Sequence, residues 1–252
     1  AMETTELFCP QITVRAGAYR FDQGVEVEVH SSRTAYFDWA KIRFTEQFQP
    51  RISLDRMDAA AIEMGYNGVL DEVFTGYVAK PDSGGASANE IVLKDEMLLL
   101  EQTSVNATFL ETTPQEVLAY ILGQAGIGRM DLSSQSYPTR KRLPIHRQTG
   151  IQAINTVNAA WGLKTPFFLS GGVFYWGTSP AQKKIYSFEY GVNIRALRRT
   201  SGVWELETIS VPFIKHSHKI LVTHPLISGE VEVSQVVTTT NDTGFIRTCI
   251  CF

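Results

Sequence analysis

The chain has 252 residues, of which 44% are hydrophobic and 19% charged, and its formal net charge is −3. This length suffices for one large domain or for two to three small ones with cores of their own. The weakly negative charge argues against nucleic-acid binding driven by bulk charge, and no apolar run is long enough for a transmembrane helix. No signal peptide is expected. The three cysteines do not make a disulfide framework and favour a reducing compartment.

The most regular pattern lies near the N-terminus. From Gly24 to His30, valine alternates with glutamate and histidine, which predicts a half-buried antiparallel strand with Val27 facing the core. A similar alternation returns at 229–234. Two such strands at opposite ends of the chain predict two similar β units with a different segment between them.

Further strands are expected over about residues 12–100. Tyr36–Phe44 alternates apolar and basic residues, and Met57–Tyr66 alternates as well, although its first part is compatible with a short helix. We favour a strand there because Asn67-Gly68 is a strong hairpin signal. Val69–Lys80 is then the return strand.

The middle of the chain predicts two helices. Thr113-Pro114-Gln115-Glu116 is a capping box with proline at the first helical position, and Thr149-Gly150-Ile151-Gln152 repeats this logic. Glycines at 126 or 128 and at 162 are expected to end the helices. The predicted buried faces are Val117, Leu118, Ile121, Leu122 and Ala125 in the first helix, and Ile151, Ile154, Val157 and Trp161 in the second.

Strands are expected again after the second helix, at 166–169, 173–176, 185–194 and 203–209, and the last fifty residues are expected to be all β. The predicted order is therefore a β unit, a small α/β insert and a second β unit.

Metal-like spacings occur near the C-terminus. On a strand, residues two apart share a face, so two of the histidines could reach one metal ion. We favour hydrogen-bonded or solvated histidines and no metal site, because the motif lacks four coherent ligands. The residues concerned are His216, His218 and His224, with Cys249 and Cys251 further on.

No catalytic constellation is recognised, and an enzyme is not predicted. The chain lacks a nucleophile elbow, and the glycines of 123–128 follow a helix, where they cannot cradle phosphate. Several carboxylates could pair for glycoside chemistry, although scattered carboxylates on strands are usually solvated. They are Asp38, Asp55, Asp58, Glu63, Asp71 and Glu72.

The sequence contains two clusters of basic residues. Each cluster could lie in a solvated loop, or it could contact an acidic partner or passing DNA. We favour the solvated loop for the first cluster. The clusters are Arg140, Lys141, Arg142 and Arg147, and then Arg195, Arg198 and Arg199.

Several segments also occur in a characteristic order. They are Gly24–Val29, Asp38-Trp39-Ala40-Lys41-Ile42 within 36–44, Gly65–Gly68, Val73–Val78, Thr113–Leu118 with Ala125-Gly126-Ile127, and Phe188–Ile194. In this order they resemble phage tail baseplate hub proteins, a family that includes the late-control D proteins of temperate contractile phages and the hub of the defective Bacillus prophage particle.

The resemblance implies a mainly β fold with two tail-tube-like β-barrels flanking a small α/β domain. The expected domains are a first barrel at 1–105, an inserted α/β domain at 106–195 and a second barrel at 196–252, which strands from elsewhere could complete. It implies a homotrimer in the virion tail baseplate, assembled in the host cytoplasm, that contacts the tail tube protein, the central spike and the tape-measure protein. DNA would only pass through the lumen. Cofactors, catalytic residues and membrane insertion are not implied.

Two other functions remain open at this stage. One is a base protein of a type VI-like spike with the same barrels. The other is a tail-associated protein that binds or hydrolyses the cell wall, which the aromatic-rich strands and scattered carboxylates would suit.

Overall fold

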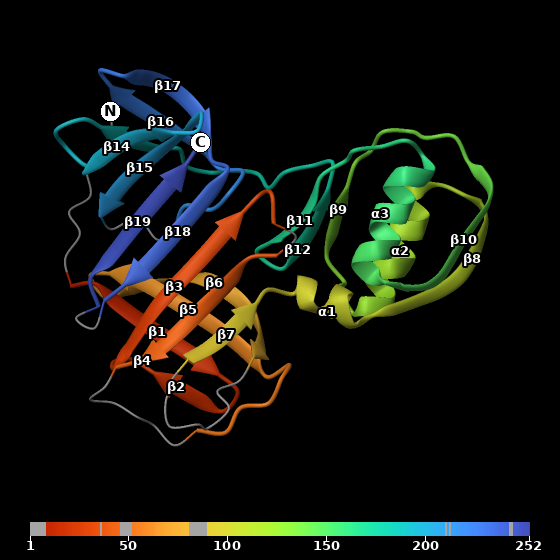
Figure 1. Ribbon diagram of the computed structural model, residues 1–252, viewed down its shortest axis with the longest axis horizontal. Helices are drawn as coiled ribbons and strands as arrows, with labels where there is room; N and C mark the ends of the chain where they lie inside the picture. Colours follow the sequence, from red (N-terminus) through yellow and green to blue (C-terminus); the bar gives the residue numbers. More distant parts are fainter. Residues whose placement is uncertain are drawn as a thin grey trace. The chain divides into compact units, whose positions relative to one another are not determined.

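A computed structural model describes residues 9–35, 37–45, 52–80, 90–209, 211, 213–241 and 244–252. The chain is mainly β, with three helices among these residues, and it divides into two compact units (Figure 1). One unit combines Ala1–Asp95 with Ala181–Phe252, and the other is Glu96–Pro180. The expected inserted segment, 106–195, overlaps the second unit, and the expected domain bounds stay a prediction. No helix within the described ranges is long and apolar enough to cross a membrane.

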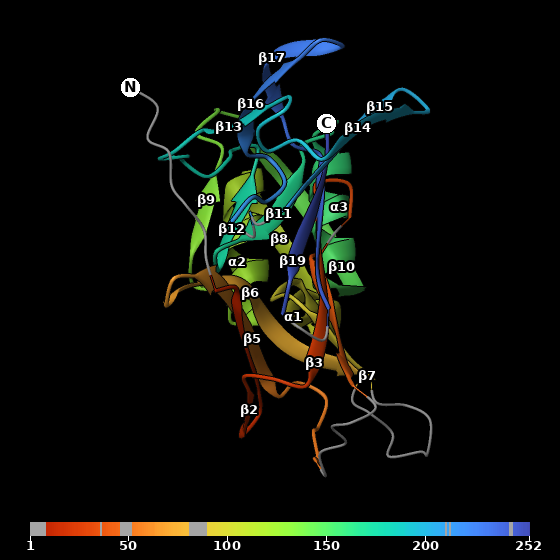
Figure 2. The ribbon, with the colours of Figure 1, turned by 90° about the vertical axis from the view of Figure 1, so that its left-hand side faces the viewer.

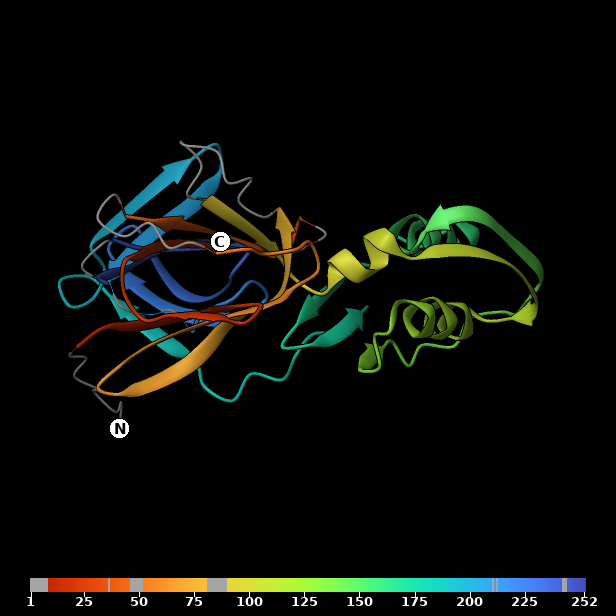
Figure 3. The ribbon, with the colours of Figure 1, turned by 90° about the horizontal axis from the view of Figure 1, so that it is seen from below.

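The first unit is built around an 11-stranded antiparallel sheet that is strongly curved (Figure 3). In spatial order its strands are β14 (Ala196–Thr200), β15 (Val203–Ile209), β19 (Ile246–Cys251), β18 (Gln235–Thr240), β3 (Val25–Ser32), β4 (Trp39–Phe44), β7 (Glu90–Lys94), β6 (Val69–Lys80), β5 (Ala59–Tyr66), β1 (Gln11–Ala16) and β2 (Tyr19–Phe21).

The two expected β units share this sheet. Strand β18 pairs with β3 and so joins the C-terminal strands to the N-terminal ones, and the Val27 amide donates a hydrogen bond of 3.0 Å to the Thr240 hydroxyl. The sheet is open, so two separate closed barrels are not confirmed. The buried side chains nevertheless form two clusters, one within residues 12–93 plus Ile246 and one within 188–250. Each half of the sheet therefore has a core of its own.

The first alternating segment forms the expected strand. The valines of β3 are 2–6% exposed, whereas the glutamates and the histidine between them are half-buried on the opposite face. The prediction that Val27 faces the core is confirmed. The second alternation forms β17 (Ile227–Glu232), which belongs to a separate three-stranded sheet with β13 (Tyr186–Glu189) and β16 (Lys219–His224). The β16–β17 hairpin extends from the rest of its unit (Figure 2). Its Val231 is only half-buried.

The Asn67-Gly68 turn joins β5 to β6, as predicted, and both turn residues have positive φ, 56° and 77°.

The predictions for two other strands need correction. Residues 97–100 belong to helix α1 (Met97–Gln102) and not to a strand, because three of its side chains are buried together on one side of a single helical turn and a half. The strand expected over 185–194 ends at Glu189, where a turn closed by the Asn193 side chain begins.

The second unit packs two helices against a two-stranded ribbon. Helices α2 (Pro114–Ala125) and α3 (Gly150–Ala160) lie side by side, and the ribbon of β8 (Ser104–Thr112) and β10 (Arg140–Thr149) curves around them (Figures 1 and 3). A small sheet with the order β11-β12-β9 completes the unit. Its strands are β9 (Met130–Leu132), β11 (Phe167–Ser170) and β12 (Val173–Trp176).

Both predicted capping boxes are confirmed. Thr113 and Thr149 each accept a hydrogen bond from the backbone three residues on, and the Glu116 and Gln152 side chains accept in return. Gly126 ends α2 with φ 78°, as expected. The buried face of α3 differs in part, because Ala153 and Asn158 are buried whereas Ile151 and Trp161 are half-buried. Asn158 is buried because its amide joins the Thr165 carbonyl to the Trp176 indole.

Candidate functional site

The most unusual polar cluster of the first unit surrounds Asp38 and His216. Asp38 precedes β4, and His216 lies in the turn before β16. The His216 side chain is 1% exposed and the Asp38 side chain 16%, and His216 Nε2 lies 3.8 Å from Asp38 Oδ1. A buried histidine and a largely buried carboxylate thus lie next to each other where several chain segments meet.

Hydrogen bonds from the surrounding backbone hold this pair in place. Asp38 Oδ1 accepts from the Ser32 amide at 3.2 Å, and the Asp38 amide donates to Asp95 Oδ2 at 2.9 Å. The His216 amide donates to the Ser31 hydroxyl at 3.2 Å. The cluster therefore fastens the end of β3, the start of β4, the end of β7 and the turn before β16 to one another.

Burial displaces both pKa values. Loss of solvation raises the pKa of Asp38 to about 6, although hydrogen bonds from Ser32 and Ser31 oppose this change. Loss of solvation, assisted by the positive charge of Arg33, lowers the pKa of His216 to about 4. Both changes in pKa favour the neutral form of the side chain. The contact therefore has a structural role, because it connects chain segments to one another.

The structure does not bring the suggested metal ligands together. His218 accepts the Lys215 amide through Nδ1, and His224 lies at the end of β16, where its ring meets that of Tyr190 edge-on. Cys249 and Cys251 lie on β19. In the described part of the chain, no group of three or more His, Cys, Asp or Glu side chains is arranged to hold a metal ion.

The candidate carboxylates have separate surroundings. Asp58 accepts the Asp55 amide at 2.8 Å in the turn before β5, and Glu63 on β5 pairs with Arg15 at 2.8 Å. Asp71 and Glu72 are exposed on β6. With Asp38 in the buried cluster, these groups stabilise turns and strands or meet solvent. None of these contacts points to a glycoside-cleaving pair.

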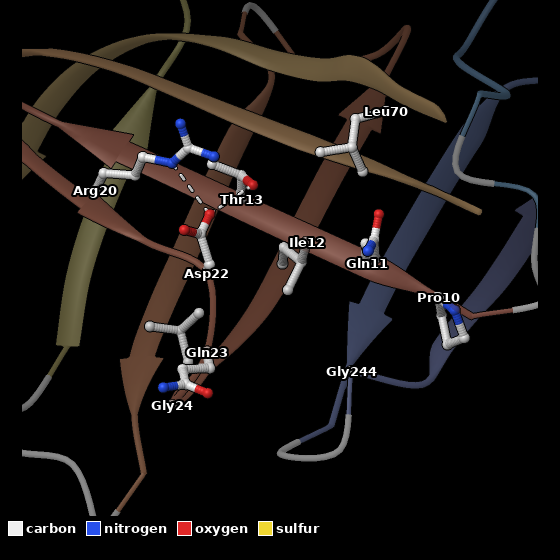
Figure 4. Close-up of a pocket in the computed structure, with 11 residues that line it drawn as sticks. Pro10, Gln11, Ile12, Thr13, Arg20, Asp22, Gln23, Gly24, Leu70 and Gly244 are labelled. Carbon is white, nitrogen blue, oxygen red and sulfur yellow. Dashed lines mark hydrogen bonds and ion pairs between the residues drawn. The ribbon is translucent and has the colours of Figure 1, made fainter. Parts of the chain in front are cut away.

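An open pocket of about 330 Å³ lies beside β1, β2 and β3 (Figure 4). Asp22 accepts the Thr13 hydroxyl at 2.8 Å and Arg20 Nε at 3.1 Å, and these bonds hold the pKa of its carboxyl below the usual value. Gln11, Gln23 and Leu70 complete much of the wall. The sequence did not suggest this site, because its lining comes from separate strands. Its charged groups already satisfy one another, so the pocket carries no reactive group.

The first basic cluster does not lie in a solvated loop, the interpretation that we favoured, because residues 140–149 form strand β10, which pairs with β8 on one side only. Lys141, Arg142 and Arg147 are exposed, and Pro144 lies within the same strand, opposite Thr108 of β8. Charged side chains and proline on an unpaired strand edge hinder pairing with other chains. Protection of this edge is a sufficient explanation for the cluster.

The second basic cluster has local acidic partners. Arg195 and Arg198 both approach Glu207, at 3.6 and 4.0 Å, and Arg247 joins them at 3.5 Å. Arg199 lies over the Trp204 ring. These guanidinium groups are therefore largely engaged within the first unit. The glycines of 123–128 lie at the end of α2, as predicted.

Comparison with solved structures gives the fold. The chain matches the 43 kDa tail protein of prophage MuSo2 from Shewanella oneidensis with a TM-score of 0.75 and 13% identity, over 97% of this chain and 98% of that one. It matches a tail protein from Neisseria meningitidis MC58 with a TM-score of 0.71 and 10% identity, over 97% and 96%. This chain has the fold of phage tail proteins.

The same fold occurs outside phages. An E. coli component of the type VI secretion system matches with a TM-score of 0.66 and 15% identity, over 95% of this chain and 76% of that one. That protein is described as structurally similar to the T4 bacteriophage tail proteins gp27 and gp5. No protein-family model matches the chain, and no curated protein matches it by sequence. The resemblance to phage tail proteins seen in the sequence is confirmed at the level of the fold.

Proposed function

We propose that this protein is a structural hub subunit of a contractile tail baseplate, from a phage, a prophage or a tailocin, that joins the tail tube to the central spike. The observation that carries the proposal is the likeness of fold to two tail proteins along nearly the whole of each chain. The order of the hub-like sequence segments supports it independently. The role is mechanical, and no reaction is assigned to the chain.

The two halves of the large sheet suggest how such a subunit would act. Each half has its own buried core, and the β18–β3 pair makes them continuous. Three subunits would supply six similar halves, which suits a ring between a sixfold tube and a threefold spike. The ring would hold the spike until the sheath contracts and would leave a lumen for DNA or the tape-measure protein. Its location would be the baseplate of the virion tail, after assembly in the host cytoplasm.

The oligomeric state tests this proposal. Size-exclusion chromatography with light scattering should give a mass of three times 28.1 kDa, and electron micrographs should show rings. A strict monomer at high protein concentration, with no ring after addition of the spike protein, would contradict it. Lysis in a zymogram on bacterial cell walls would favour the wall-hydrolysing alternative instead.

A second candidate is the base of a type VI-like spike. The likeness to the E. coli secretion-system component favours it. Both candidates use the same mechanics, so the neighbouring genes distinguish them. Genes for a tape measure, a tail tube and other baseplate proteins would support the tail hub, whereas secretion-system genes in their place would support the spike base.

A further inference from the structure

Strand β17 leaves one edge of its three-stranded sheet open. It pairs with β16 on one side, and no described strand pairs with its other side. The backbone amides and carbonyls of an unpaired edge can receive a further strand unless proline, lysine or a bulge hinders it. Residues 227–232 contain no proline and no lysine, and their register with β16 is continuous. Because the hairpin extends from the rest of its unit, this edge is open to a partner (Figure 2).

Strand β14 is an open edge of the large sheet, since among the described strands it pairs only with β15. Leu197 of β14 and Val231 of β17 pack against the same buried cluster, the one within 188–250, and both remain half-buried. Each lies on the last strand of its sheet, so no further strand covers it. A strand added at either edge would therefore bury apolar surface.

The edge at β17 is acidic. Its sheet carries one lysine and three glutamates, which are Lys219, Glu189, Glu230 and Glu232. The Glu230 side chain lies 3.0 Å from Lys219 and is 49% exposed. The Glu232 side chain contacts Arg33 and is 42% exposed. Both carboxylates can therefore meet a further cation on a partner.

The edge at β14 is basic. The β14–β15 hairpin and the residues beside it carry four arginines and two glutamates, which are Arg195, Arg198, Arg199, Arg247, Glu205 and Glu207. Three of the guanidinium groups share the Glu207 carboxylate, and the Arg198 side chain is 64% exposed. A surplus of positive charge remains at this edge. Complementary charges across an interface attract the partners and fix their register.

The two strands also match in the alternation of their side chains. On β17, Glu230 is exposed, and Val231 after it faces the core. On β14, Leu197 faces the core and Arg198 after it is exposed. If the edges pair, glutamate and arginine become neighbours on the outer face, and valine and leucine become neighbours on the inner face.

We propose that β14 of one copy of this chain pairs with β17 of a second copy, so that a sheet continues across the contact. The contact joins two different surfaces of the chain, so it repeats head to tail and can close into a ring of three. This inference rests on the proposed hub function and adds to it the residues through which the subunits meet. Arg198 and Glu230 are the charges at the contact, and Leu197 and Val231 are its apolar side chains.

Charge reversal with rescue tests the pairing. Light scattering over a dilution series measures how readily the trimer dissociates. Arg198→Glu and Glu230→Arg should each weaken the trimer by about tenfold or more, because like charges then meet across the contact. The double variant restores opposite charges and should come within about threefold of the wild type. Arg142→Glu is the matched control, since it reverses an exposed arginine on β10, an edge strand of the other unit, and should leave the trimer unchanged.

Hydrogen exchange on the unaltered protein is a second measurement, which decides the matter if a variant does not fold. The amides of β14 and β17 should exchange more slowly in the trimer than in protein diluted to monomers, whereas those of β10 should not change. A trimer without this protection, a trimer that both single variants leave intact, or a folded double variant without rescue would overturn this inference and leave the hub function standing. A wild-type chain that stays monomeric at high concentration would contradict the hub function itself.

Discussion

His216 Nε2 lies 3.8 Å from Asp38 Oδ1 in a setting where both side chains are largely buried. The contact fastens the turn before β16 to the start of β4 and so connects parts of the chain that are far apart in sequence. Arg33, Lys215 and His218 contribute positive charge nearby, and Asp95 accepts the Asp38 amide. Stability should therefore depend on the protonation of this pair.

The two groups should give opposite pH dependences. The folded-state pKa of Asp38, about 6, lies above its ordinary value of 3.8, so its contribution is full at low pH and is lost as pH rises through 6. The folded-state pKa of His216, about 4, lies below its ordinary 6.5, so its contribution is present above pH 6.5 and is lost as pH falls through 4. In the wild-type chain the two effects oppose each other between pH 4 and 6.

Single variants should separate them. His216→Gln leaves the Asp38 effect, so its free energy of unfolding should rise relative to wild type as pH falls from 6.5 to 4. Asp38→Asn should show the reverse trend. Each change is on the order of 2–3 kcal/mol, from shifts of about two pKa units. Urea titrations at several pH values measure them, and parallel profiles for the two variants would refute the assignment.

The two faces of β3 should respond differently to substitution. Val27 is 2% exposed, so Val27→Ala should cost about 1–3 kcal/mol through lost burial and a residual cavity. Glu26→Gln with Glu28→Gln should cost much less, because partly exposed carboxylates contribute little. Thermal melts compare the variants. Equal losses, or a larger loss for the glutamates, would mean that the faces are reversed.

Gly76 should not tolerate a methyl group. A Cβ atom there would lie 2.0 Å from the Lys94 carbonyl oxygen, which belongs to the backbone of the neighbouring strand. Gly76→Ala should therefore destabilise the first unit by about 1–3 kcal/mol or more. Gly123→Ala is the matched control, because nothing lies within 4 Å of its Cβ and α2 should gain about 0.5–1 kcal/mol. Denaturant midpoints that move in the same direction for both would contradict this.

A chelator should leave the melting temperature unchanged. The His216 ring nitrogens contact Asp38 and Ser217. The Nδ1 atoms of His218 and His224 each accept a hydrogen bond from a backbone amide. Elemental analysis of the purified protein with melting curves in EDTA checks this. Stoichiometric zinc together with a large loss of melting temperature would show a metal site that these contacts do not explain.

Local patterns were enough to predict many of the elements. The alternation at 24–30, the Asn67-Gly68 turn and the boxes at Thr113 and Thr149 all depend on residues close in sequence. The physical causes are short-range: side chains alternate along a strand, αL conformations favour Asn and Gly, and hydroxyl groups cap the amides of the first helical turn. These short-range effects do not depend on contacts with distant parts of the chain.

Helix α1 and the ribbon of β8 with β10 were not predicted, because their stability comes from distant partners. Gly150 illustrates this, since a Cβ atom there would lie 2.9 Å from the Leu100 carbonyl oxygen of α1, which shows how closely the two helices approach. Neither α1 nor the ribbon has a sequence pattern as regular as that of β3. Helix α1 packs against α2 and α3, and the ribbon combines its own ladder with packing against the same two helices.

Patterns in the amino-acid sequence were enough to predict that β segments flank a helical middle, and the order of its segments indicated the tail-protein fold. The three-dimensional fold was needed to show that the two β segments share one open sheet through β18 and β3, and that Asp38 contacts His216. Period-2 alternation specifies which face of a strand is buried but not which strand lies beside it. Pairing between residues as distant as Val27 and Thr240 depends on the closure of a long loop and on the burial of both cores together.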